Sequence, residues 1–208
     1  MTPGRWARFA CGVWTEGEDP WIEAKLWDSL KVDIHQVKAG EEVWCAVNYG
    51  VVNPAIVLAA RRPDDAVAVK AEIFEGETSY SLIERRLLEL KDEYDLTEVT
   101  YDAKTFLRSS ELLETAGLPM LELPHSPERM TIVSSTLYRL AQTKKIRHDG
   151  DKELRAQVLA GVIKESERGP RLVQSFRTRA LIAMAVACHQ ATQVGRMSVY
   201  ESRGLEHV

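Results

Sequence analysis

The first half of the folded part of this chain has an apolar pattern typical of buried β-strands. Apolar residues dominate three short segments, 43–47, 55–60 and 66–74, and the first of them is apolar on both faces. Such segments are typical of central strands in a sheet that is covered on both sides. A short turn, 61–65, joins the second segment to the third, so the sequence predicts an antiparallel hairpin there.

A helical spacing begins after residue 79. Ile83, Leu87, Leu90 and Tyr94 follow at intervals of 4, 3 and 4 residues, which predicts a helix over 79–94. The remaining pattern predicts strands over 98–101 and 119–123, helices over 105–116, 126–142, 151–160 and 179–194, and a small hairpin around Gly169-Pro170.

Helix ends are also marked by residue type. Gly117 suits the left-handed position just past a helix end. Ser126 followed by Pro127 is a strong helix start, with the serine as cap and proline in the first helical position. Asp151 is expected to open the next helix in the same way.

The order β-β-β-α-β-α-β-α predicts an α/β domain with a mixed sheet flanked by helices, in the ribonuclease H-like order. We place this domain at residues 41–195, after an N-terminal arm, 1–40, and before a polar tail, 196–208, that is expected to be flexible. The arm contains a short helix near 21–30. Its tryptophans need an apolar surface, either on this domain or on a missing neighbour, and they are Trp6, Trp14, Trp21 and Trp27.

Composition narrows the class of protein. With 45% hydrophobic and 28% charged residues, the chain reads as an ordinary soluble globular protein. The formal charge of −4 argues against bulk coating of nucleic acid, although a local basic face stays open. No apolar run approaches the roughly 20 residues that span a bilayer.

The spacing of the cysteines and the lack of a phosphate-binding loop argue against several other kinds of site. Cys11, Cys45 and Cys188 form no C-x-x-C pair, so they indicate small buried side chains rather than a zinc site or a disulfide framework. His148 is interpreted as structural, bonded to a loop carbonyl. The chain has no G-x-x-x-x-G-K-[ST] loop, so any packaging motor is expected to be a separate polypeptide.

Several local patterns, in order, resemble one known family. Trp21 to Trp27, followed by the strand start at 41–44, resembles a connector that leads into a first strand. Tyr101-Asp102 before a helix and the exit at 114–119 resemble an acidic motif. Residues 146–154 carry an H-x-G-x-x-x-L spacing, and an Ala-rich helix ends the pattern. From about residue 8 to 191, the sequence resembles the C-terminal nuclease domain of phage terminase large subunits, the DNA-packaging motor proteins.

This resemblance implies a two-metal endonuclease site, with Mg²⁺ or Mn²⁺ held by three acids. One acid ends the first strand, one ends the fourth, and one begins the last helix. The matching positions here are Asn48, Asp102 and Arg179, so only Asp102 is retained as a metal ligand. Two dications need several carboxylates, whereas a guanidinium about 4 Å from a dication costs on the order of several kcal/mol.

Two interpretations of these replacements stay open. In the first, Arg179 stands in for the metals and forms an ion pair with Asp102. In the second, other acids replace the lost ligands, and the candidates are Glu72, Glu75, Asp149, Asp151, Glu165 and Glu167.

A negative net charge is compatible with a groove whose surface is locally positive. The order of the elements is expected to place many cations near the edge of the sheet that carries Asp102, where they would contact the DNA backbone. The main DNA-binding candidates are Lys104, Arg108, Lys144, Lys145, Arg147, Arg171 and Arg177, with Arg129, Arg168 and Arg179 in the same segments.

The resemblance therefore implies a role on double-stranded DNA in phage genome packaging, in the host cytoplasm. The partners it implies are a packaging ATPase, a small terminase subunit or a portal. Two functions stay open: a two-metal DNA endonuclease anchored on Asp102, and an inactive pseudonuclease that binds DNA or docks on the motor or portal.

Overall fold

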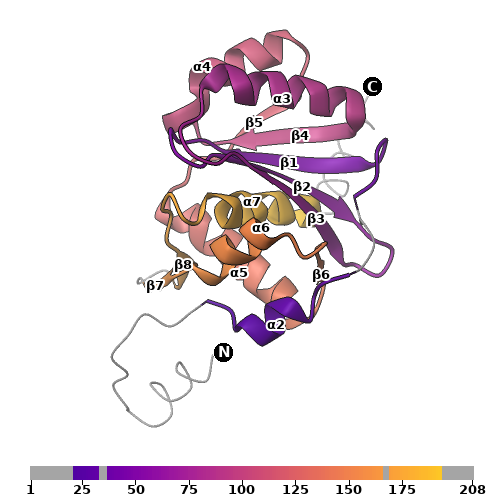
Figure 1. The fold of residues 1–208 in the computed structure, drawn as a ribbon, viewed down its shortest axis with the longest axis vertical. Helices are drawn as coiled ribbons and strands as arrows, with labels where there is room; N and C mark the ends of the chain where they lie inside the picture. The colour runs from indigo at the N-terminus through magenta and orange to yellow at the C-terminus, as the bar shows by residue number, and fades with distance from the viewer. Residues whose placement is uncertain (1–20, 33–36, 166–168, 194–208) are drawn as a thin grey trace, which may run out of the picture.

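The computed structural model describes residues 21–32, 37–165 and 169–193. Its centre is a six-stranded sheet in the order β5-β4-β1-β2-β3-β6 (Figure 1). These strands are β1 (Glu42–Asn48), β2 (Ala55–Arg61), β3 (Val67–Ile73), β4 (Asp95–Tyr101), β5 (Met120–Glu122) and β6 (Ile146–Arg147). A separate small hairpin pairs β7 (Ile163–Lys164) with β8 (Arg171–Leu172).

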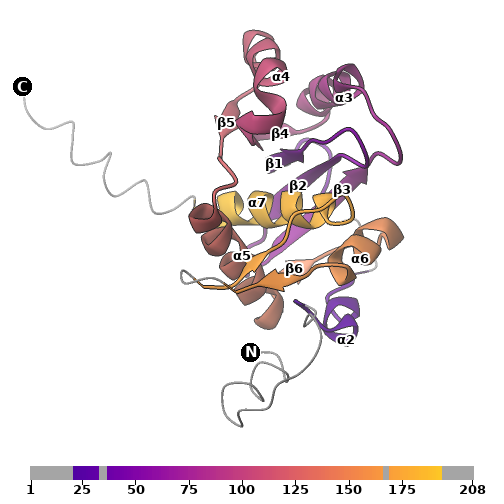
Figure 2. The ribbon, with the colours of Figure 1, turned by 90° about the vertical axis from the view of Figure 1, so that its left-hand side faces the viewer.

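Helices cover both faces of the sheet. They are α2 (Ala24–Asp28), α3 (Tyr80–Glu93), α4 (Ala103–Thr115), α5 (Pro127–Gln142), α6 (Lys152–Leu159) and α7 (Arg179–Gln193). Figure 2 shows α3 and α4 on one side of the sheet, and α7, α5 and α6 on the other, with α2 beyond them. The predicted mixed sheet flanked by helices is confirmed.

Strand direction decides which residues meet at each edge. β1 pairs parallel with β4 and antiparallel with β2, and β2 pairs antiparallel with β3. Within this sheet, β2 therefore runs against the other strands. Because β1 and β4 are parallel, their carboxyl ends lie at the same edge, which brings Asn48 and Asp102 together.

Two apolar layers hold the sheet. Alternate residues of β1 face opposite sides: Val43, Cys45 and Val47 pack toward α3 and α4, whereas Trp44 and Ala46 pack toward α7. This double burial is the reason why β1 reads as apolar on both faces. Small residues, among them Ala180, Ala183 and Ala187, let almost the whole of α7 lie buried against β1 and β2.

The predicted helix ends are confirmed where polar caps were expected. The Ser126 hydroxyl accepts from the backbone N–H of Arg129 at 3.3 Å, and Asp151 accepts from that of Leu154 at 2.7 Å. Gly117 has φ +81°, in the left-handed region. The pattern missed β6, because this strand is only two residues long and is defined by its pairing with Val67 and Ala68.

The described part of the arm lies on its own domain. Trp21 and Trp27 are buried, and the Trp21 indole N–H donates to the carbonyl of Val158 at 2.5 Å. A bidentate ion pair between Arg155 and Asp28, at 2.6 and 2.9 Å, ties α6 to α2. The helix here, α2, is shorter than the predicted 21–30. Trp6, Trp14 and the predicted tail 196–208 lie outside the described residues.

His148 forms the second link to the arm: its role is structural, as predicted, but the carbonyl that it bonds belongs to α2 and not to a loop. Its ring stacks on Trp27 with centroids 4.1 Å apart. Nδ1 accepts from the N–H of Gly150 at 3.1 Å, so Nε2 carries the proton and donates to the Trp27 carbonyl at 3.0 Å. Burial lowers the pKa of His148, against the opposite influence of Asp149 and Asp28.

Cys45 and Cys188 are small buried side chains, as predicted. Both are free thiols, and burial raises the pKa of each, that of Cys188 to about 12. Cys11 lies outside the described residues. Neither described thiol is therefore poised to act as a nucleophile at neutral pH.

Lowering the pH from 7 to 5 is expected to destabilise the fold through His148. Its ordinary pKa is 6.5 and the folded value is lower, so the unfolded chain binds the proton first and stability falls as pH drops below about 6.5. Thermal unfolding at pH 7, 6 and 5 measures this. The loss of Tm should be smaller in His148→Gln than in the parent protein.

Burial also lowers the pKa of His189. His189→Gln should therefore also reduce the loss of Tm between pH 7 and pH 5, and the variant with both substitutions should show the smallest loss. If His148→Gln lost as much Tm between pH 7 and pH 5 as the parent protein does, His148 would not be a source of the pH dependence.

Candidate functional site

The three positions expected to carry acids do meet at one edge of the sheet. Asn48 is the last residue of β1, Asp102 directly follows β4 and caps α4, and Arg179 is the first residue of α7. Asn48 is 3% exposed and Asp102 8% exposed. Figure 1 shows this edge at the left, where α4 and α7 begin.

The Asn48 side chain is bonded as an amide on both of its polar atoms. Its Nδ2 donates to the backbone carbonyl of Arg179 at 3.3 Å. Its Oδ1 accepts from Nε2 of Gln174 at 3.1 Å. An aspartate here would place a carboxylate oxygen against the Arg179 carbonyl, so the local hydrogen bonding favours asparagine.

The chain of polar contacts continues from Gln174 toward Asp102. Oε1 of Gln174 lies 3.1 Å from Nδ1 of His125, and that nitrogen lies 3.6 Å from Oδ2 of Asp102. The side chains of His125 and Asp102 are 8% and 10% exposed. Asp102 also accepts from the N–H of Lys104 at 3.3 Å. We call Asn48, Gln174, His125 and Asp102 the polar bridge.

Arg179 does not join this bridge, so the expected ion pair between Arg179 and Asp102 is wrong. The guanidinium donates through Nε to the Val52 carbonyl at 2.9 Å and through Nη1 to the Tyr49 carbonyl at 3.1 Å. Burial lowers the pKa of Arg179, but an arginine side chain stays charged. Arg179 therefore clamps the loop between β1 and β2.

Gly50 provides the space for this clamp. A Cβ atom at position 50 would overlap the Nη2, Cζ and Nη1 atoms of Arg179. Any larger residue would have to displace the guanidinium from the Tyr49 and Val52 carbonyls. Gly50 and Arg179 therefore form an interlocking pair.

These residues do not fit a two-metal centre. One carboxylate, Asp102, is present at the site, and the other two positions hold an amide and a cation. Among the described residues, no group of three or more His, Cys, Asp and Glu side chains could hold a metal ion. Two adjacent dications need more negative charge than one aspartate supplies.

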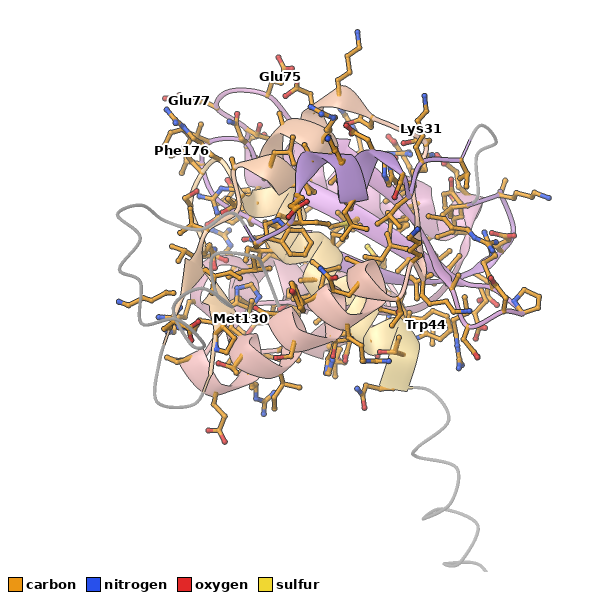
Figure 3. All side chains as sticks on the ribbon, turned by 90° about the horizontal axis from the view of Figure 1, so that it is seen from below. Lys31, Trp44, Glu75, Glu77, Met130 and Phe176 are labelled. Atoms are coloured by element: carbon orange, nitrogen blue, oxygen red, sulfur yellow. The ribbon has the colours of Figure 1, made fainter. Side chains whose placement is uncertain are left out.

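The acids proposed as substitutes are engaged elsewhere or lie in loops. Glu72 accepts two hydrogen bonds from Arg86, at 2.7 and 2.8 Å. Asp149 and Asp151 bond backbone N–H groups at the start of α6. Glu75 lies on the β3–α3 connection (Figure 3), Glu165 follows β7, and Glu167 lies outside the described residues. None of the described ones joins the polar bridge.

The predicted DNA-binding residues fall into two groups at opposite ends of the sheet. Around the polar bridge, helix starts and the β8–α7 loop carry exposed cations, with the carboxylates of Glu122 and Glu128 near them. These cations are Lys104, Arg108, Arg129 and Arg177. Arg171 lies in β8, and Arg168 is outside the described residues.

The second group is not at this edge, contrary to expectation. Lys144, Lys145 and Arg147 flank the start of β6, which pairs with the start of β3. Arg147 forms an ion pair with Asp64 at 2.7 Å, and Lys145 donates to the Asp64 carbonyl. Because β2 runs antiparallel to β1, this turn lies at the opposite end of the sheet from Asn48.

His125 and Gln174 were not foreseen as site residues. His125 follows β5, which pairs parallel with β4, so its place at the carboxyl end of a neighbouring strand was the available signal. Gln174 lies in the loop between β8 and α7, and no spacing in the sequence marks it.

Gly50→Ala is expected to destabilise the protein by about 1–3 kcal/mol, because the new methyl group overlaps the guanidinium. In an Arg179→Ala background the same substitution should cost less than about 1 kcal/mol, because the obstructing group is gone. Urea unfolding of the four proteins of this double-mutant cycle measures the coupling. Additive effects would disprove the interlock.

Comparison with known proteins tests the fold. No family model matches the chain, and no curated protein matches it significantly. Solved structures do match. The large terminase of bacteriophage HK97 superposes with a TM-score of 0.74 at 16% identity, over 84% of this chain and 44% of that one.

Two further solved structures have the same fold as this chain. The large terminase of a thermophilic bacteriophage in complex with ADP gives a TM-score of 0.65 at 14% identity, over 93% of this chain and 49% of that one. The large terminase nuclease of the thermophilic phage G20c with bound magnesium gives 0.59 at 18% identity, over 74% and 85%. That nuclease also has structures with cobalt and zinc.

The chain thus spans about half the length of the two large terminases and most of the isolated nuclease. At these identities the likeness concerns the fold, and the residues at the site must be judged on their own geometry. The chain has the ribonuclease H-like fold of the nuclease domains of phage large terminases.

Proposed function

We propose that this protein acts in phage DNA packaging as a terminase nuclease-like module that holds duplex DNA without two-metal cleavage. The polar bridge is the observation that carries this proposal. Asn48 accepts one hydrogen bond from Gln174 where metal-binding carboxylates would be needed, and the Arg179 guanidinium is committed to the β1–β2 loop. The Asn48 amide thus has a hydrogen-bond partner on each of its polar atoms without a metal ion.

The surface around the bridge supports contact with the DNA backbone. Exposed cations lie on α4, at the start of α5 and before α7, and they are Lys104, Arg108, Arg129 and Arg177. Side chains on helix starts add to the favourable field that a helix N-terminus offers to phosphate. Such contacts position a duplex but read no sequence.

The partners are proposed from the structural neighbours. This chain spans about half the length of the two large terminases, so the module is proposed to work with a packaging ATPase and with a small terminase subunit or portal. Among the described helices, none has the length and apolar character needed to cross a bilayer. The host cytoplasm is the location that this role requires.

Plasmid DNA incubated with the protein and Mn²⁺ is expected to stay uncut. Asn48→Asp combined with Arg179→Asp restores acids at both replaced positions and is expected to yield Mn²⁺-dependent nicking. Adding Asp102→Ala to this variant should abolish the nicking, which controls for contaminating nuclease. Cleavage by the parent protein that Asp102→Ala removes would show an active enzyme and reject the proposal.

Duplex binding is the second requirement. Lys104→Ala with Arg108→Ala is expected to weaken binding of a duplex of about 30 base pairs at low salt and to lower the slope of log K against log salt by about 1 per cation removed. Arg85→Ala on α3, an exposed arginine away from this edge, is the matched control and should leave the slope unchanged. Equal slopes in all three proteins would place the duplex elsewhere or exclude it.

A further inference from the structure

A cavity of about 660 Å³ lies at the opposite end of the sheet from the polar bridge. It opens between the β2–β3 turn, α5 and the last turn of α7. Asn48 pairs with Ala55 at the start of β2, whereas Arg61 ends that strand. Over this length of strand the cavity lies roughly 20 Å from the polar bridge. Figure 1 shows the ends of β2 and α7 together with β6 at this side.

Three arginines from two different parts of the chain line the cavity. Arg61 and Arg62 come from the end of β2 and its turn, and Arg139 from the last turn of α5. Asp65 is the acid in the lining. The cavity wall is therefore positive in a protein whose formal charge is −4.

Two of these guanidiniums are held in place before any ligand arrives. Arg62 donates to Glu41 at 3.0 Å and to the carbonyl of Arg61 at 2.9 Å. The Arg61 guanidinium lies 5.9 Å from the ring centroid of Trp44, a cation–π distance. Figure 3 shows Trp44 and Phe176 on opposite sides of the molecule. Phe176 lies two residues after Gln174 of the polar bridge. Such preorganisation lowers the entropic cost of binding.

Arg139 has no such role in the fold. Its side chain is exposed and makes no hydrogen bond or ion pair with the part of the chain that the structure describes. Its guanidinium keeps its full set of donors for a ligand, whereas those of Arg62 are largely taken by Glu41 and Arg61.

We propose that this cavity binds a small molecule that carries two or more phosphate groups. Guanidinium groups match phosphate oxygens in a bidentate manner, and several of them converging favour a polyanion over a single carboxylate. The volume falls within the range of about 300–1,000 Å³ of small-molecule sites. Ile132 and Leu140 add an apolar wall suited to the body of such a ligand. Nothing in this inference depends on the polar bridge or on DNA binding there.

Isothermal titration calorimetry with tripolyphosphate, in metal-free buffer and with the full chain, tests the proposal. Saturable binding of one tripolyphosphate per chain is expected, and Arg139→Gln should weaken it at least tenfold while the Tm stays unchanged. Arg61→Gln should weaken it similarly. Arg85→Gln, an exposed arginine on α3 that is paired with Glu89, is the matched control and should bind as the parent does.

ATP and duplex DNA serve as two further ligands in this test. ATP without metal should compete with tripolyphosphate, because it presents the same phosphate chain. Absence of saturable binding, or equal weakening in Arg85→Gln, would overturn the proposal. A duplex that needs Arg139 while tripolyphosphate fails to bind would also overturn it, because the cavity would then be part of a DNA surface.

Discussion

The packing of α7 against β1 and β2 is the constraint on which this structure depends. The two strands are buried on both faces, so one face needs a helix that is apolar along almost its whole length. Small side chains on α7 permit the close approach that places its first residue beside the last residue of β1. The hydrogen bond from the Asn48 amide to the Arg179 carbonyl follows from this placement.

Replacing acids at such an edge leaves a geometric problem as well as a chemical one. Carboxylates that no longer surround a metal would repel one another, and unpaired polar groups in a buried place are costly. Here hydrogen bonds link Asn48 through Gln174 to His125, whose ring lies 3.6 Å from Asp102, and the Asp102 carboxylate accepts from the N–H of Lys104. The Arg179 guanidinium donates instead to two backbone carbonyls of the β1–β2 loop.

Much of this fold could be predicted from the sequence, since β1, β2 and the long helices carry strong apolar periodicity and clear caps. The meeting of Asn48, Asp102 and Arg179 was implied by the resemblance to terminase nuclease domains. The direction of the Arg179 side chain was not, because it depends on the space left by Gly50. The placement of Lys144, Lys145 and Arg147 failed for a simple reason: the 16 residues of α5 carry the chain about 24 Å from the site edge to the other end of the sheet.

The interlock of Gly50 and Arg179 has a consequence for the side chains that this edge of the sheet can accept. Position 50 must lack a side chain as long as an arginine that bonds the Tyr49 and Val52 carbonyls stands at the start of α7. Replacement of the arginine alone abandons two carbonyl groups, and a side chain at the glycine alone collides with the arginine. A single substitution at either position is therefore expected to lower stability, so the two positions cannot vary independently.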